Sequence, residues 1–301
     1  MTHPSPAELA ASLVTLLTVA EIDVDLFRGA LNPHGVGRLF GGQAIAQALT
    51  AATQTVPAER AVHSLHAYFM RPGSEDHEVT YKVERDFDGG SFSTRRVIAM
   101  QQGKPILNFA ASFHKLEEGL AHQEKMPDVP EPEMLRNDFE LRGKVIDTIP
   151  ERFRAMFTRP RPIEFRPVDV RPWMNDQKQE PLQRSWFRVA APIGDDPALH
   201  RAVAAYASDM QLLGTCTMPH GLNWMKGEIM TASLDHAIWF HDDFRADEWL
   251  LYVCESPWSG RGRGMNHGKI FSRDGRLIAS VSQEGLIRKM VQPAASASSA
   301  S

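Results

Sequence analysis

The sequence predicts an α+β protein made of two tandem repeats, each with a long helix followed by an antiparallel sheet. Two stretches about 170 residues apart predict the same succession of strands, which indicates an internal repeat. The first opens with Ser64-Leu-His-Ala-Tyr-Phe69, and the second with Ser233-Leu-Asp-His-Ala-Ile-Trp-Phe240. A helical pattern precedes the strands in both halves. A repeat of this length implies two related domains that pack against each other.

The composition is that of a globular protein with room for two domains. The chain has 301 residues, of which 43% are hydrophobic and 23% charged. The formal net charge of -4 argues against a nucleic-acid surface, so a small-molecule substrate is the better expectation. Cys216 and Cys254 are the only cysteines and form no CxxC pair. We therefore expect buried free thiols in a reducing cytoplasm rather than disulfides or a zinc site.

The N-terminal apolar run, Leu9 to Ala20, is too short to span a bilayer and lacks a basic flank. Acidic residues follow it, among them Glu21 and Asp23. This pattern favours an amphipathic helix over a signal peptide. We expect a cytoplasmic protein with no membrane partner.

The first repeat begins with Gly41-Gly42 and continues into a stretch, Gln43 to Thr55, in which apolar residues recur at helical spacing. The many alanines of this predicted helix would let it lie close to a sheet. Pro57 ends it. Four runs rich in strand-forming residues follow, separated by turn signals: Val62 to Met70, His77 to Phe87, Ser91 to Gln102 and Pro105 to His114.

Residues 117–174 are rich in proline and charge, so we expect a connector with one short helix from Glu133 to Arg142. This places an N-terminal domain at residues 1–116 and a C-terminal domain at residues 175–292. Residues 293–301 are small and polar, and we expect them to form a disordered tail.

The second repeat opens with a predicted strand, Arg184 to Ala190. Asp195-Asp-Pro197 then supplies an N-cap and a first-turn proline for a helix that reaches about Ser208. Further strand candidates are Ala232 to His241, Trp249 to Glu255, Arg263 to Ser272 and Leu277 to Arg288. The order of helix and strands has repeated.

Several strings in these repeats resemble those of the acyl-CoA thioesterase II family, which has a double hotdog fold in which curved antiparallel sheets wrap long helices. They occur in the family's order: Phe40-Gly-Gly-Gln-Ala-Ile-Ala-Gln-Ala48, His63-Ser-Leu-His-Ala-Tyr-Phe-Met-Arg-Pro-Gly73, Tyr206-Ala-Ser-Asp-Met210, Ser233-Leu-Asp-His-Ala-Ile-Trp-Phe-His241 and Gln283-Glu-Gly-Leu-Ile-Arg288. The resemblance implies hydrolysis of acyl-CoA to a free acid and CoA with no metal or redox cofactor. Together with exposed sheet edges, it also implies association into homo-oligomers.

Members of the family use an Asp, a Ser or Thr, and a Gln, which match Asp209, Ser233 and Gln283 in this sequence. A thioester already has a good leaving group, so hydrolysis chiefly needs an activated water and stabilisation of the oxyanion. Asp209 would accept a proton from this water, while Ser233 and Gln283 would orient it. Taken singly, each is also an ordinary helix-end or strand residue. The run Met210 to Leu213 is less aromatic than is common in the family, which leaves the acyl-chain preference open.

Gly41 and Gly42 are candidate oxyanion donors. They precede the first predicted helix, where free backbone N–H groups and the helix dipole favour negative charge. A simple turn into the helix explains the same residues equally well.

Arg261 and Arg263, in Gly260-Arg-Gly-Arg-Gly264, are candidates for binding a CoA phosphate. A glycine-rich hairpin between two strands explains the same residues without a ligand, and it is the favoured interpretation. Metal binding by His63 and His66 is disfavoured, because their spacing on a strand points the rings to opposite faces.

Two other functions remain open. Asp235-His236 and His241 would allow a hotdog hydratase or dehydratase that acts on CoA substrates. A non-catalytic acyl-CoA sensor would keep the fold and the pocket, but it has no need of a water-activating carboxylate. Ser233 lacks the GxSxG surroundings of a covalent nucleophile, so direct attack by water is preferred.

Overall fold

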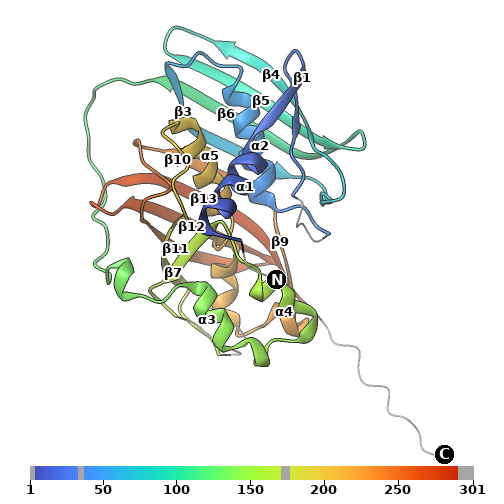
Figure 1. Cartoon of the computed structure of the whole chain (residues 1–301), viewed down its shortest axis with the longest axis vertical. Coiled ribbons are helices and arrows are strands. Elements are labelled where there is room, and N and C mark those ends of the chain that lie inside the picture. The colour runs from blue at the N-terminus through green and yellow to red at the C-terminus, as the bar shows by residue number, and fades with distance from the viewer. Residues whose placement is uncertain (1–3, 33–36, 171–176, 291–301) are drawn as a thin grey trace, which may run out of the picture.

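Two helices form the centre of the molecule, and strands wrap around them (Figure 1). The structure, a computed structural model, describes residues 4–32, 37–170 and 177–290. The central helices are α2 (Gly41–Thr53) and α5 (Pro197–Ser208), one from each repeat. The predicted starting point of α5 is confirmed: Asp196 is its N-cap and accepts a hydrogen bond from the Ala198 N–H at 2.9 Å.

The described strands form one antiparallel sheet of 13 strands that runs through both repeats. In the first repeat they are β1 (Val19–Asp23), β2 (Leu26–Gly29), β3 (Arg60–Phe69), β4 (Thr80–Asp88), β5 (Phe92–Gln101) and β6 (Lys104–Lys115). The others are β7 (Ile163–Pro167), β8 (Leu182–Val189), β9 (Ile229–Ser233), β10 (Asp235–Phe240), β11 (Leu250–Gly260), β12 (Arg263–Ser272) and β13 (Leu277–Lys289).

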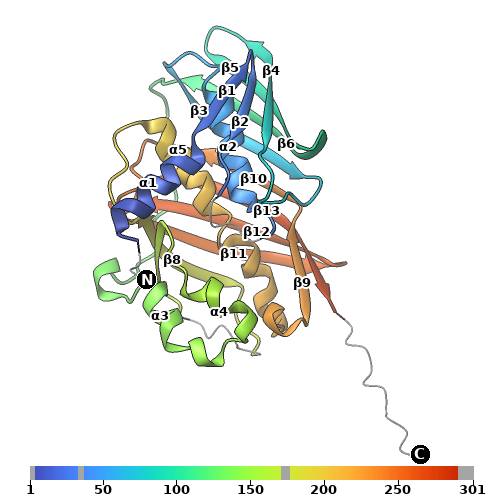
Figure 2. The same cartoon turned by 45° about the vertical axis from the view of Figure 1, so that its right-hand side comes forward.

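The two halves of the sheet are joined by β3 and β10, the strands that carry the repeated strings. They pair antiparallel, with Ala237 opposite His66 and Trp239 opposite Ser64. The order of the strands is β1-β2-β4-β5-β6-β3-β10-β13-β12-β11-β8-β7, and β9 pairs with β13 off this path. The predicted α+β double hotdog, with a curved sheet around a helix in each half, is therefore confirmed (Figures 1 and 2).

One hydrophobic core runs through both repeats and surrounds the central helices. Nearly every residue of α2 from Gly42 to Ala52 is buried, as is most of α5 from His200 onward. Burial on all sides requires small side chains, because a helix that touches a sheet on one side and another helix on the other has little room around it. The alanine content of the first predicted helix has this physical role.

The N-terminal helix α1 (Pro6–Leu17) begins slightly earlier than the apolar run suggests. Ser5 and Glu8 form a capping box in which the Glu8 carboxylate accepts from the Ser5 N–H at 2.7 Å. The helix packs its apolar face into the shared core through Leu13 and Leu17. No helix in the described part of the chain is long and apolar enough to cross a membrane.

The proline-rich segment between the repeats lies against the second repeat. Pro130 accepts a hydrogen bond from the Trp186 indole at 2.9 Å, and Glu124 forms an ion pair with Lys269 at 2.8 Å. Further along, the segment forms η1 (Pro132–Met134), α3 (Asp138–Lys144), η2 (Ile146–Thr148), α4 (Glu151–Thr158) and the strand β7, which pairs with β8. The helix predicted from Glu133 to Arg142 is therefore displaced, and part of the expected connector belongs to the half of the sheet that the second repeat forms. Residues 293–301 lie outside the described residues.

Candidate active site

Asp209 lies where the two central helices meet. It is the C-cap of α5, and its side chain is only 5% exposed. The first turn of α2 faces it so closely that a Cβ on Gly41 would lie 2.7 Å from Oδ2 of Asp209. A Cβ on Gly42 would lie 2.5 Å from the carbonyl oxygen of Tyr206. The Gly-Gly pair therefore permits the N-terminal end of one helix to approach the C-terminal end of the other.

Three donors surround the Asp209 carboxylate. Nε2 of Gln283 donates to Oδ1 at 2.7 Å, and the Ser233 hydroxyl and the Gly42 N–H are further donors. Burial raises the pKa of Asp209 to about 6, and the three hydrogen bonds oppose this rise because they stabilise the charged form. Asp209 is thus a carboxylate that is ionised near neutral pH yet more basic than an exposed one.

Gln283 and Ser233 reach Asp209 because the strands are irregular at this point. Ser233 at the end of β9 pairs with Gly285, whereas Ala237 on β10 pairs with Ser282. The advance of four residues from Ser233 to Ala237 therefore faces an advance of only three residues on β13, and the extra residue makes a β-bulge. Bulges re-aim side chains, and here the bulge lies beside both residues.

A buried histidine contacts the same amide nitrogen of Gln283 that donates to Asp209. Nδ1 of His236 is 3.1 Å from Nε2 of Gln283, and Nε2 of His236 is 2.9 Å from Oγ of Ser208. The His236 side chain is fully buried, and this burial lowers its pKa to about 3. The ring is therefore neutral at physiological pH.

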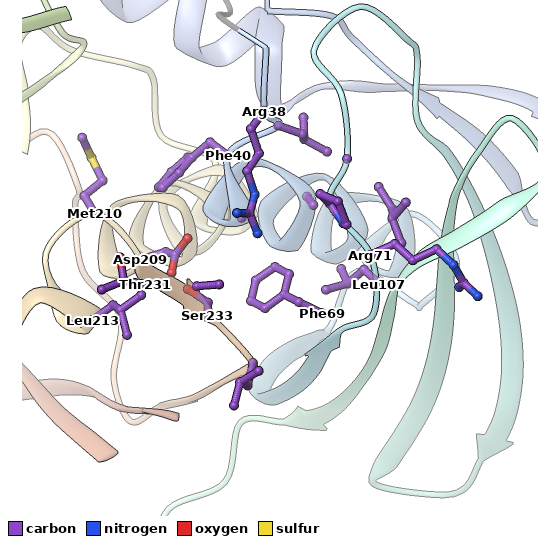
Figure 3. Close-up of a pocket in the computed structure, with 18 of the residues that line it drawn as sticks. Arg38, Phe40, Phe69, Arg71, Leu107, Asp209, Met210, Leu213, Thr231 and Ser233 are labelled. Carbon is purple, nitrogen blue, oxygen red and sulfur yellow. The ribbon is translucent and has the colours of Figure 1, made fainter. Parts of the chain in front are cut away.

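Asp209 and Ser233 line a cavity of about 630 Å³ to which both repeats contribute (Figure 3). Its walls are largely apolar, and its charged lining residues are Asp209, Arg38 and Arg71. Other lining residues include Leu39, Phe40, Phe69, Ile106, Leu107, Met210, Leu213, Leu222, Trp224 and Ile229. In Figure 3 the guanidinium of Arg38 points toward Ser233 and Phe69. A cavity of this volume and polarity suits a ligand with an apolar part and a few polar groups.

The structure brings together Asp209, Ser233 and Gln283, the residues matched from the sequence. It also places Gly41 and Gly42 beside them, but the Gly42 N–H is directed to the Asp209 carboxylate. Gly41 lines the cavity.

Arg261 and Arg263 do not line the cavity; they lie at the exposed hairpin between β11 and β12. Arg263 pairs with Glu284 at 2.8 Å. The hairpin itself agrees with the favoured interpretation of this glycine-rich string. The arginines that line the cavity, Arg38 and Arg71, were missed, although both lie in or beside the strings that suggest the family.

Comparison with known proteins agrees with this architecture. A family profile described as "Acyl-CoA thioesterase N-terminal domain" matches residues 30–114, and one described as "Acyl-CoA thioesterase" matches residues 153–286. Acyl-coenzyme A thioesterase 8 of Homo sapiens is 43% identical over 292 residues, which cover 94% of this chain and 91% of the relative. Acyl-CoA thioesterase 2 of Haemophilus influenzae is 38% identical over 282 residues, which cover 94% of this chain and 99% of the relative.

Solved structures give the same result. The acyl-CoA thioesterase II TesB2 from Mycobacterium marinum superposes with a TM-score of 0.76 at 38% identity, covering 94% of this chain and all (100%) of the other. A hotdog-fold protein from Alicyclobacillus acidocaldarius shares the fold, with a TM-score of 0.70 at 19% identity and a coverage of 92% of this chain and 98% of the other. This chain therefore belongs to the acyl-CoA thioesterase II family and is a thioester hydrolase with a double hotdog fold.

Proposed function

We propose that this chain hydrolyses acyl-CoA by direct attack of water on the thioester carbonyl, with Asp209 as the general base. The water oxygen bonds to the carbonyl carbon while its proton passes to Asp209. The tetrahedral intermediate then collapses, the carbon–sulfur bond breaks, and the proton held by Asp209 passes to the leaving sulfur, so that the products are a carboxylic acid and CoA. The observation that carries this proposal is a buried carboxylate with a pKa near 6 in the wall of a largely apolar cavity.

Ser233 and Gln283 would orient the water and the base. The Ser233 hydroxyl is next to Asp209 and also lines the cavity. Gln283 fixes the carboxylate through Nε2, and its buried Oε1 has no hydrogen-bond partner among the described residues. A buried amide oxygen without a partner is costly unless a ligand satisfies it, so Oε1 is suited to accept a hydrogen bond from the attacking water.

The oxyanion would form at the first turn of α2. Gly41 is at the N-terminal end of this helix and lines the cavity, so its N–H and the helix dipole favour negative charge there. Because Gly42 already donates to Asp209, Gly41 is the better candidate of the predicted pair.

The substrate's anionic groups would contact the arginines of the cavity. Arg38 and Arg71 are exposed cations in the same wall as apolar residues that suit an acyl chain. A guanidinium is well matched to phosphate because it offers several donors in one plane. No resident metal or redox group enters this mechanism.

The hydratase alternative has less support. Asp235 and His236 are consecutive residues of a strand, so their side chains point to opposite faces. Asp235 accepts a hydrogen bond from the Glu284 N–H at 2.6 Å, and His236 is neutral with both ring nitrogens in hydrogen bonds. His241 contacts the Ser280 hydroxyl at 2.9 Å. None of the three is a proton donor that lines the cavity.

A cytoplasmic location and assembly into homo-oligomers stay predictions. The ends of the described sheet, β1 and β7, have open edges at which further strands can pair. Size-exclusion chromatography with light scattering tests the assembly directly.

The experiment that tests the proposed function is continuous detection of free CoA thiol from a panel of acyl-CoAs. Wild-type protein and Asp209→Asn are compared side by side, with circular dichroism to confirm folding. We expect kcat to fall by about 100-fold or more in the variant. Equal turnover would remove Asp209 from the mechanism, and saturable binding without thiol release by the wild type would favour the sensor.

A further inference from the structure

Gln283 works in this site only if its amide has one particular orientation. The end that faces Asp209 lies 2.7 Å from Oδ1, so it must be the nitrogen when the carboxylate is charged. The two ends of an amide are nearly the same size, and packing alone does not choose between them. When Asp209 holds a proton its O–H can instead donate to an amide oxygen, so a second group is needed to keep the nitrogen at this position in both protonation states.

The group in contact with that same nitrogen is Nδ1 of His236, at 3.1 Å. A bare ring nitrogen accepts a hydrogen bond, whereas a protonated one donates. The amide nitrogen of Gln283 has two hydrogens, so it can donate one to Asp209 and the other to His236. An amide oxygen placed there would meet a carboxylate oxygen and a ring lone pair instead.

The tautomer of His236 is in turn fixed by α5. The Ser208 hydroxyl donates to the carbonyl oxygen of Ala205 at 3.0 Å, so its oxygen is left to accept from Nε2 of His236 at 2.9 Å. The single ring proton is therefore on Nε2, and Nδ1 is bare. Since Ser208 and Asp209 are consecutive, the last turn of α5 anchors both ends of this hydrogen-bonded chain.

We propose that His236 is a positioning residue for thioester hydrolysis: its bare Nδ1 holds the Gln283 amide with the nitrogen toward Asp209. This inference rests on the proposed function, because it assumes that Asp209 and Gln283 act together on water. His236 does not line the cavity and would not touch the substrate. Its neutrality matters as well: a charged ring 3.9 Å from the carboxylate would pair with Asp209 and reverse the amide.

Two substitutions separate positioning from packing. The side-chain oxygen of an asparagine is as far along the chain as Nδ1, so His236→Asn can keep an acceptor for Gln283. The amide of a glutamine lies one atom further out, so His236→Gln can keep the contact with Ser208 but loses that acceptor. We expect kcat to fall by roughly 10-fold to 100-fold in His236→Gln with little change in KM, and clearly less in His236→Asn.

The pH profile is a second readout. Without the hydrogen bond from Gln283 the pKa of Asp209 rises, so the acid limb of kcat moves to higher pH in His236→Gln. Among the described residues, Tyr206 on α5 and Tyr252 on β11 also interact electrostatically with Asp209, and burial raises the pKa of both. They remain neutral across this range and do not produce the limb.

Ser208→Ala keeps the test decisive if both His236 variants fail to fold. It removes the acceptor that fixes the ring tautomer, and we expect a lower kcat at unchanged KM. Equal kcat and equal pH limbs in His236→Asn and His236→Gln, or a wild-type profile in Ser208→Ala, would overturn the inference.

Gln283→Ala distinguishes this failure from that of the proposed function. If Gln283→Ala lowers kcat, and His236→Gln has no further effect in that background, the two residues act as one unit. If Gln283→Ala alone retains the wild-type kcat, the proposed role of Gln283 is wrong and the inference falls with it.

Discussion

The backbone of Gly42 lies against the carbonyl oxygen of Tyr206, so closely that a Cβ at Gly42 would be 2.5 Å from that oxygen. This contact places the first turn of α2 on the last turn of α5. It also directs the Gly42 N–H to the carboxylate of Asp209. The contact between the two repeats is thus also the site of the proposed general base.

Gly42→Ala is expected to push the two helices apart, because the carbonyl it would meet is backbone and has little freedom to move. We expect a loss of about 1–3 kcal/mol in the free energy of unfolding and a fall in kcat. Gly143→Ala is a matched control, since a Cβ at Gly143 would meet nothing within 4 Å. Urea denaturation and thiol release measure the two effects, and wild-type behaviour of Gly42→Ala would contradict the close contact.

The kcat of thioester hydrolysis should fall as the pH drops through about 6. Burial raises the pKa of Asp209 to about 6, and a protonated carboxyl group cannot accept a proton from water. Ser233→Ala removes a hydrogen bond to the charged form of Asp209, so the acid limb of its pH profile should move to higher pH. Steady-state kinetics across this range test both points. An acid limb near pH 4 would show that Asp209 titrates like an exposed carboxylate.

Asp209→Asn should stabilise the fold at high pH while it removes activity. The pKa in the folded state, about 6, lies above the ordinary value of 3.8, so the folded protein favours the protonated form. The contribution of this carboxyl group to the free energy of unfolding is fully present below its unfolded pKa, and it is lost as the pH rises through about 6. An amide avoids this loss, and we expect a gain of up to about 3 kcal/mol at pH 8 and little change at pH 4. Urea denaturation at the two pH values checks the sign, and equal gains at both would contradict it.

Most elements of the fold could be predicted because their signals are local. Asp196 and Pro197 define the start of α5 in the sequence and in the structure alike. The missed strands are β1, β2 and β7, short pieces at the ends of the sheet. β1 and β2 form a hairpin that joins the sheet only through the pairing of β2 with the distant β4, and β7 joins it through β8. The run from Ala232 to His241 was predicted as one strand, but it divides at Leu234, whose N–H bonds to the Glu284 carbonyl.

The candidate site could be predicted where its residues lie in a recognisable sequence string, but not where its contacts depend on packing. Asp209, Ser233 and Gln283 follow from family strings, and the structure brings all three together. The bare Nδ1 of His236 depends on Ser208, a contact that no sequence pattern encodes.

The C-cap of α2 is Gln54, where α5 has Asp209, and this end of the helix pair opens on a separate cavity with Pro197 and Ala198. The two helices therefore end differently although the repeat is visible in the sequence: α5 ends at a carboxylate, Asp209, and α2 ends at an amide, Gln54.

The two arginine pairs give contrasting expectations for CoA binding. Arg38 and Arg71 line the cavity, whereas Arg261 and Arg263 lie at an exposed hairpin. We expect R38A/R71A to raise KM by about 10-fold or more, because hydrogen bonds to charged groups contribute about 1.5–3 kcal/mol each.

The matched control is R261A/R263A, which should leave KM close to the wild-type value. Arg263 pairs with Glu284 in an exposed ion pair, and such pairs contribute about 0–1 kcal/mol. Salt adds an internal check: the wild-type KM should rise with ionic strength, and this dependence should weaken in R38A/R71A because fewer cations attract the phosphates. If KM instead rises in R261A/R263A, the CoA phosphates bind at the hairpin, and the disfavoured interpretation of the glycine-rich string is the right one.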